Sequence, residues 1–399
     1  MSATGPGQAA DPRRLADYSG ELKRQLVAFA ESARFDRWRE PELARAADAS
    51  DGAAPRKGSS RWVSAMDDFI MTFRFADGTG VIDRFLAARG KDLRKSDRRM
   101  LESWRDPVDG IFELRGRTSD SGTLFNLLDE LEYRVYSSAD FAGIGADGDF
   151  ILARLVPLTA DAWLVSGAMS PFPRAHARVV AELALEWLAS RPLLAFRNPE
   201  KARLGWELMR AERDEFVEFF GSDQVIIPAG EAESRINEYY RARQEKALAR
   251  RSPDKPLPEV TAGVDRPYFA IPESLRGLAT IGAAYDETDG MSLLPDLGLL
   301  EELFTRPELA ADPRYADALV GYLDSGSVYP GPLRRLAAAH PGTVDEVYRT
   351  VLSKPGFTWA KQGEQLLRKR KPWYFAHERY PTATPASDYL TNLLSSAAS

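Results

Sequence analysis

Two clusters of basic residues are the strongest functional candidates in this sequence. The first follows a long charged segment and consists of Arg241, Arg243, Lys246, Arg250 and Arg251. The second consists of Arg368, Lys369, Arg370 and Lys371, and it is followed by Trp373, Tyr374, Phe375 and His377. Proteins hold single-stranded nucleic acid with basic side chains along the phosphates and with aromatic rings that stack on the bases. The clusters therefore predict nucleic-acid contacts, although cations at the C-terminal end of a helix are also favoured without any ligand.

The other reactive residue types exclude several kinds of catalytic centre. The chain has no cysteine, which excludes disulfides, thiolate zinc sites, iron–sulfur clusters and a cysteine nucleophile. Its three histidines, His176, His340 and His377, lie far apart in the sequence. None of them is paired with a carboxylate at the spacing of metal ligands, so we expect neither a metal nor a cofactor.

Two glycine motifs and two acidic motifs have structural interpretations. The string GIGADG at 143–148 matches the dinucleotide fingerprint but leads into a predicted strand, so we interpret it as a loop between strands. Gly78 and Gly80 are interpreted as a turn that begins a helix. Asp67 and Asp68 are adjacent, so on a helix they point about 100° apart and should not converge on one substrate atom. The acids of YDETDG lack the EF-hand pattern and are interpreted as solvated turn residues.

The elements that would carry such sites include a small β module in an otherwise helical chain. Between residues 107 and 172, five short segments are separated by turn signals, and FELRGR and EYRVYS alternate apolar with polar residues. This pattern predicts an α+β fold, mostly helical, with a central β-barrel-like module of about five strands. Charges of both signs on its outward positions argue against a dedicated phosphate groove.

The helical parts predict a division of the chain into four regions. Residues 1–60 are expected to form a disordered N-terminus, a helix and a linker, and residues 61–249 to hold helices around the β module. The proline-rich stretch 250–278 is expected to be a linker before a helical C-terminal domain at 279–399. Val180 and Trp187, on the best amphipathic helix, are expected to cover the apolar face of the module.

A stretch of the sequence resembles a module of uncharacterised bacterial proteins. The resemblance runs from residue 96 to 174 through SDRRMLESWRDPVDGIFELRGR, TLFNLLDELEYRVYS, GDFILARLVPL and AWLVSG. Some of these proteins carry a short zinc-binding tail similar to that at the C-terminus of the SecA translocase. This chain has no cysteine and departs from them there. The resemblance implies a fold and no activity.

Composition leaves a binding role as the favoured function. The 399 residues carry a net charge of −6, with 44% hydrophobic and 28% charged residues, which is typical of a soluble globular protein. No signal peptide or membrane-spanning run is visible, so we expect a cytoplasmic protein without a membrane partner. We favour a non-catalytic binding or adaptor protein with an unidentified protein partner. The alternatives are nucleic-acid binding through the C-terminal basic and aromatic segment, or a carboxylate-dependent hydrolase with convergent acids in a deep pocket.

Overall fold

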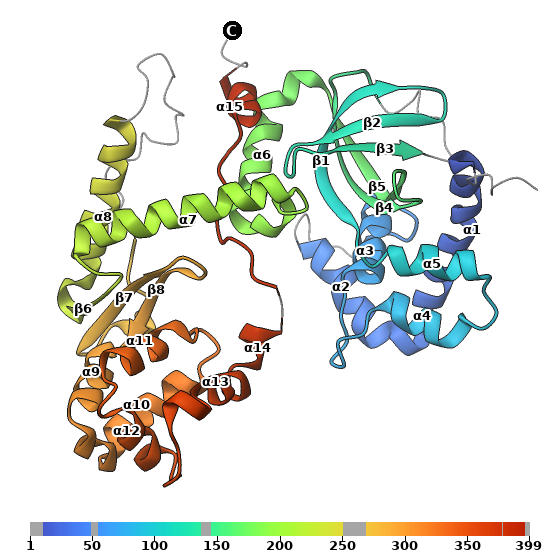
Figure 1. Ribbon diagram of the computed structural model, residues 1–399. Coiled ribbons are helices and arrows are strands. Elements are labelled where there is room, and N and C mark those ends of the chain that lie inside the picture. Colours follow the sequence, from blue (N-terminus) through green and yellow to red (C-terminus); the bar gives the residue numbers. More distant parts are fainter. Residues whose placement is uncertain (1–10, 49–54, 137–144, 250–268, 377, 396–399) are drawn as a thin grey trace, which may run out of the picture. The chain divides into compact units, whose positions relative to one another are not determined.

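The computed structural model describes residues 11–48, 55–136, 145–249, 269–376 and 378–395, and the described chain forms two compact units (Figure 1). The first unit consists of Met1–Asn198 together with Ala386–Ser399, and the second consists of Pro199–Pro385. The expected boundary at 250–278 therefore lies within the second unit, and most of it falls outside the described residues. The α+β class is confirmed.

Five helices form the N-terminal part of the first unit. They are α1 (Pro12–Ala30), α2 (Asp36–Asp48), α3 (Ser60–Met71), α4 (Val81–Arg89) and α5 (Lys95–Ser103). Helix α1 begins where the Asp11 carboxylate accepts the Arg13 amide, and Pro12 occupies the first helical position. Helix α3 begins at Ser59, whose hydroxyl accepts the Trp62 amide at 3.2 Å.

The β module follows these five helices in the same unit. Its strands are β1 (Val108–Arg117), β2 (Ser121–Asn126), β3 (Glu132–Tyr136), β4 (Phe150–Pro157) and β5 (Trp163–Phe172). They pair in the cyclic order β1-β2-β3-β5-β4, and β4 returns to pair with β1. The five predicted strands are confirmed, but the ring closes only loosely because β3 and β5 share two residue pairs.

The helices and the β module share one apolar core. Phe35 and Phe69 from the helical part are each about 1% exposed, and they belong to the same buried cluster as Val156 of β4 and Leu164 of β5. Trp104, directly after α5, is also buried and donates its indole N–H to the Pro157 carbonyl at 3.1 Å. The module is therefore built onto the helices, as a sheet that must bury one face requires.

A bulge in β5 lets helix α3 approach the sheet closely. The register between β4 and β5 shifts between Leu152 and Arg154, and on β5 the backbone of Gly167 has a φ of +79°. A Cβ atom at position 167 would lie 3.1 Å from the Cβ of Asp67. Glycine suits this position because it accepts a positive φ and leaves room for the aspartate.

Helix α6 (Ala177–Ser190) packs against α15 (Asp388–Ser395), which brings the end of the chain back into the first unit. Val180 is buried, as expected. Trp187 is only partly buried, and the Arg191 guanidinium lies 4.0 Å from its ring centre. Trp187 lines the same cavity as Leu152 and Arg154 of β4, and that it covers the apolar face of the module stays a prediction.

A buried aspartate in the β2–β3 turn gives the first unit an unusual pH dependence. Asp129 accepts the Tyr133 hydroxyl at 2.5 Å and the Leu131 amide at 2.9 Å. Burial raises the pKa of Asp129 to about 6, although these hydrogen bonds oppose the rise. Because the unfolded carboxyl loses its proton at a lower pH than the folded one, this group makes the folded state less stable as pH rises from about 4 to about 6.

In the wild type, Asp129 should lower the free energy of unfolding by up to about 3 kcal/mol as pH rises from 4 to 7. We expect Asp129→Asn to lack this decrease. Urea unfolding at both pH values measures the difference. Asp161→Asn, in the exposed turn before β5, is the control and should leave the pH dependence unchanged. An equal pH dependence in the wild type and Asp129→Asn would contradict the raised pKa.

The second unit has a three-stranded sheet between two groups of helices. Its elements are α7 (Pro199–Phe220), β6 (Gln224–Pro228), α8 (Ala229–Ala249), β7 (Thr280–Asp286), β8 (Gly290–Pro295), α9 (Leu297–Thr305), α10 (Pro313–Asp324), α11 (Gly331–Ala339), α12 (Val344–Val351), α13 (Trp359–Arg370) and α14 (Pro372–Phe375). The strands are antiparallel in the order β6-β7-β8. Ile281 and Ala283 of β7 join the cluster with α7 and α8, whereas Ala284 joins the cluster with α9 to α13. The prediction of a helical domain at 279–399 missed the strands β7 and β8, which lie within that range.

Candidate functional site

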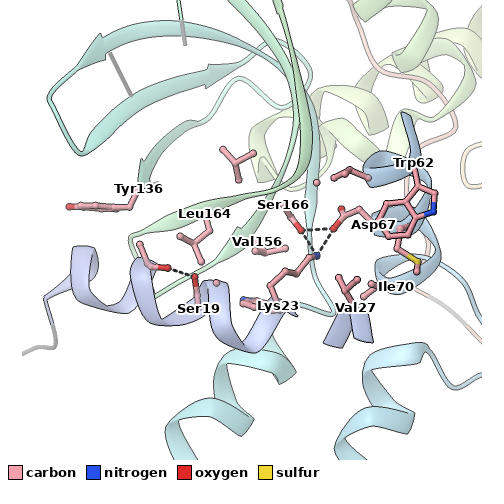
Figure 2. Close-up of a pocket in the computed structure, with 17 residues that line it drawn as sticks. Ser19, Lys23, Val27, Trp62, Asp67, Ile70, Tyr136, Val156, Leu164 and Ser166 are labelled. Carbon is pink, nitrogen blue, oxygen red and sulfur yellow. Dashed lines mark hydrogen bonds and ion pairs between the residues drawn. The ribbon is translucent and has the colours of Figure 1, made fainter. Parts of the chain in front are cut away.

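Side chains from three elements of the first unit meet in a buried polar cluster at Asp67 of α3 (Figure 2). The Asp67 carboxylate accepts the Ser166 hydroxyl of β5 at 2.7 Å and a hydrogen bond from the Lys23 ammonium of α1. The Lys23 ammonium also donates to the Ser166 oxygen at 2.8 Å. Lys23, Asp67 and Ser166 therefore form a closed triangle that joins the helices to the β module.

Arg154 of β4 extends the cluster on the far side of Asp67. Its guanidinium donates to Asp67 at 3.1 Å and to Asp109 of β1 at 2.6 Å, and it forms an ion pair with Asp68 at 2.7 Å. Asp67 and Asp68 contact different nitrogens of this guanidinium, so the expectation that they do not converge on one atom is not contradicted. One planar guanidinium can receive two carboxylates that point in different directions.

The charges of the cluster explain how its carboxylates titrate. Burial alone would raise the pKa of Asp67, but the charges of Lys23 and Arg154 outweigh burial and hold that pKa below its ordinary value. Burial lowers the pKa of Lys23, and the contact with Asp67 opposes this. Burial raises the pKa of Asp68, against the attraction of Arg154. Asp67 is thus the stabilised anion of the cluster.

A cavity of about 320 Å³ opens beside the triangle, between α1, α3 and the β module. Its wall includes Lys23, Asp67 and Ser166, and the rest of the wall is mainly apolar. Figure 2 shows the aromatic and aliphatic side chains around it, among them Trp62, Ile70, Tyr136, Val156 and Leu164. A mostly apolar cavity with a few convergent polar groups is the usual form of a small-molecule site.

A second cavity of about 260 Å³ shares part of its lining with the first. It shares Asp67, Ser166 and Gly167 with the first cavity, and it is also lined by Arg154 and Trp187. Asp68 and Asp109 line it as well. The acidic side chains of the cluster are therefore divided between the two cavities, and the first cavity has only one of them.

Gly20 is an unexpected residue in the wall of the first cavity. It lies inside the 19-residue helix α1, where glycine is about 0.5–1 kcal/mol less favourable than alanine. A Cβ atom at position 20 would have no atom of another residue within 4 Å, so no close contact requires a glycine here. The absence of a side chain instead leaves the space above the helix open to the cavity.

Most residues of the predicted C-terminal site make contacts with other residues of the second unit. The Lys371 ammonium is buried and donates to the carbonyls of Tyr322, Ser325 and Val328 at 2.7, 3.1 and 2.6 Å. Arg370 pairs with Asp324 at 2.7 Å, the Arg368 guanidinium lies 4.5 Å from the ring centre of Phe375, and the buried Tyr374 donates to Asp289. Arg368, Lys369, Arg370 and Trp373 are exposed, and His377 lies outside the described residues.

The residues of the other predicted basic cluster face glutamates. Arg243 contacts Glu212 and Glu215 of α7, and Lys246 contacts Glu218. Arg241 is exposed, while Arg250 and Arg251 lie outside the described residues. Helices α7 and α8 are therefore joined by matched charges at these positions instead of presenting them as one basic surface.

The remaining sequence motifs have structural roles where they are described. His340 contacts Glu301 at 2.8 Å, and His176 is exposed. Gly80 begins helix α4, and its amide donates to Asp83 at 2.7 Å, while residues 145–148 form a loop that leads into β4. Among the described residues, no group of three or more histidine, aspartate or glutamate side chains is placed to hold a metal ion.

Sequence reasoning missed Lys23, Arg154 and Ser166. Lys23 and Ser166 are 143 positions apart, so no local motif contains them. Two weak signals were present. Arg154 interrupts the apolar strand FILARLVP, and Gly20 interrupts a helical pattern at a cost in helix stability relative to alanine.

Neither a search for membrane-spanning helices nor comparisons with known proteins indicate what the site does. None of the described helices combines the length and the hydrophobicity that crossing a membrane requires. The resemblance of residues 96–174 to uncharacterised bacterial proteins stays a prediction. Comparisons with protein-family models, with curated proteins and with solved structures found no match for this chain.

Proposed function

We propose that this protein is a non-catalytic binding protein that takes a small molecule into the cavity beside Lys23. The observation that carries this proposal is Gly20, a helix-interior glycine whose missing side chain keeps the cavity open at a cost in stability. The cavity volume of about 320 Å³ and its mainly apolar wall also suit a small ligand. An unidentified protein partner and a cytoplasmic location stay part of the proposal.

The chemistry of the triangle favours binding over hydrolysis. Ser166 and Lys23 lie 2.8 Å apart, the distance expected of a nucleophile and its general base. A lysine base must be neutral to accept the serine proton. Burial lowers the pKa of Lys23, but its contact with Asp67 opposes this and favours the ammonium form. Asp67 itself is a weak base because its pKa is held below the ordinary value. The triangle of Lys23, Asp67 and Ser166 is therefore better suited to a structural role than to proton transfer.

The nucleic-acid alternative has less support from the positions of the basic residues. Lys371 has its ammonium buried among three carbonyls, and Arg370 is paired with Asp324. Arg368, Lys369, Arg370 and Trp373 are exposed, so a smaller basic surface than predicted is available. A phosphate would compete with Asp324 for Arg370 and would not reach the buried ammonium of Lys371.

Substitutions at Gly20 test the proposal. We expect Gly20→Leu to weaken binding of the neutral fluorescent probe N-phenyl-1-naphthylamine by about tenfold or more, because the new side chain fills part of the cavity. Gly20→Ala should raise the free energy of unfolding by about 0.5–1 kcal/mol with a smaller effect on binding. Probe fluorescence and urea unfolding measure the two quantities.

A matched control is available in the second unit. Gly321 also lies inside a helix, α10, it is exposed, and a Cβ atom at its position would have no other atom within 4 Å. Gly321→Leu should give a similar gain in helix stability and leave probe binding unchanged. The proposal fails if the probe binds equally well to Gly20→Leu and to the Gly321→Leu control.

A further inference from the structure

We infer that the ligand of this cavity is an uncharged molecule with a flat apolar body and one hydrogen-bond acceptor, which receives an N–H of Lys23. The inference rests on the proposed function, because it names the class of molecule that the same cavity would take. Three properties of the cavity lead to it: the charge balance of the cluster, the donors of Lys23 and the shape of the apolar wall.

The charge balance disfavours an anionic ligand. The positive charges of Lys23 and Arg154 face the three carboxylates of Asp67, Asp68 and Asp109, which leaves a surplus of one negative charge. The ammonium of Lys23 is already in contact with Asp67. An anion that entered the cavity would meet a compensated cation and a net negative neighbourhood, and it would also lose its hydration.

A cationic ligand is disfavoured because the cavity exposes more of the Lys23 side chain than of the Asp67 side chain. The Lys23 side chain is 24% exposed, whereas the Asp67 side chain is 4% exposed. The oxygens of Asp67 already accept hydrogen bonds from Lys23, Ser166 and Arg154. A ligand ammonium would therefore meet the ammonium of Lys23 before it could reach a carboxylate.

The donors of Lys23 favour an acceptor on the ligand. An ammonium has three N–H donors, and among the described residues Lys23 gives hydrogen bonds to two oxygen acceptors, Asp67 and Ser166, while its nitrogen lies 5.9 Å from the centre of the Trp104 ring. At that distance the ring is a weak partner for the third donor, and an oxygen acceptor would be a stronger one. A neutral carbonyl, ether or hydroxyl oxygen would satisfy it without adding charge.

The wall of the cavity sets the shape of the ligand body. The indole rings of Trp62 and Trp104 and the ring of Tyr136 line it together with aliphatic side chains. Aromatic side chains favour offset or edge contacts with other flat apolar groups. A volume of about 320 Å³ has room for a bicyclic body with a short substituent.

A matched series of four naphthalene derivatives tests the ligand class on the full chain. Naphthalene has no acceptor, 2-acetylnaphthalene has one neutral acceptor, 2-naphthoate is an anion and 2-naphthylmethylamine is a cation at neutral pH. Displacement of N-phenyl-1-naphthylamine measures their affinities. We expect 2-acetylnaphthalene to bind about tenfold or more tightly than each of the others, because only it satisfies the Lys23 donor without a net charge.

Measuring the same series on variants tests whether Lys23 causes the tighter binding of 2-acetylnaphthalene. In Lys23→Met, 2-acetylnaphthalene should lose its advantage over naphthalene, while naphthalene itself still binds. Lys361→Met, an exposed lysine of α13 in the second unit, is the control. If Lys23→Met does not fold, the series on the wild-type protein still decides between the ligand classes.

The failure of the inference and the failure of the proposed function give distinct results. Tightest binding of 2-naphthoate or 2-naphthylmethylamine, or equal binding of naphthalene and 2-acetylnaphthalene, would overturn the ligand class while the cavity remained the site. Probe binding that is unchanged in Gly20→Leu would overturn the proposed function, and the ligand class with it.

Discussion

Asp67→Asn should lower the free energy of unfolding of the first unit by about 3–5 kcal/mol. The substitution removes the carboxylate that contacts both Lys23 and Arg154. Arg154 keeps Asp68 and Asp109, but the described structure gives Lys23 no second carboxylate in contact. A largely buried ammonium without a counter-ion accounts for the expected loss. Urea unfolding followed by hydrogen exchange of peptides from the first unit measures it.

The neighbouring Asp68 provides the matched control. Its side chain is 61% exposed although it also contacts Arg154, so Asp68→Asn should cost no more than about 1 kcal/mol. The double variant Lys23→Met with Asp67→Asn should lose less than the sum of the two single variants, because it leaves no unpaired ammonium. Equal losses for Asp67→Asn and Asp68→Asn would show that the triangle does not act as a buried ion-pair network.

Lys371→Met should destabilise the second unit by about 3–5 kcal/mol. The ammonium of Lys371 has no exposed surface and donates to three backbone carbonyls that end α10 and form the loop behind it. Burial lowers the pKa of Lys371 to about 8, so the group remains protonated at neutral pH. Methionine has a similar length and no donor, and it would leave the three carbonyls buried without partners.

Lys369→Met is the control for this prediction, because Lys369 is exposed two positions earlier on α13. It should change the free energy of unfolding by less than about 0.5 kcal/mol. Hydrogen exchange of peptides from α10 and from residues 325–330 measures the local effect. A stability of Lys371→Met equal to that of Lys369→Met would contradict the structural role assigned to Lys371.

The sequence predicted the β module well because its strands are signalled locally. Alternation of apolar and polar residues and turn residues at the joints are properties of neighbouring positions. The central strand β7 of the second unit lacks these signals. Both of its faces are covered by helices, so TIGAAYD does not alternate. Its small residues have a packing reason, since a Cβ atom at Gly282 would lie 2.5 Å from the Leu297 side chain.

The candidate site could not be predicted because its contacts are not local. Lys23, Asp67 and Ser166 are separated by 44 and 99 positions and come from two helices and a strand. The basic residues that the sequence singled out form a local run, and the structure explains much of that run by helix ends and ion pairs. Local composition detects clusters along the chain, whereas a buried network is specified by the tertiary fold.

The position of α15 makes the first unit a discontinuous domain, with the whole second unit inserted between α6 and α15. During synthesis, residues up to Asn198 leave the ribosome while the helix that packs on α6 does not yet exist. At roughly 5–20 residues per second, the ribosome needs roughly 10 to 40 s to translate the insertion. Until then Phe125 lacks its ring contact with Tyr389, and the surface of α6 that α15 covers is open to water. The first unit therefore passes through a nascent stage in which the part of α6 that α15 later covers is exposed.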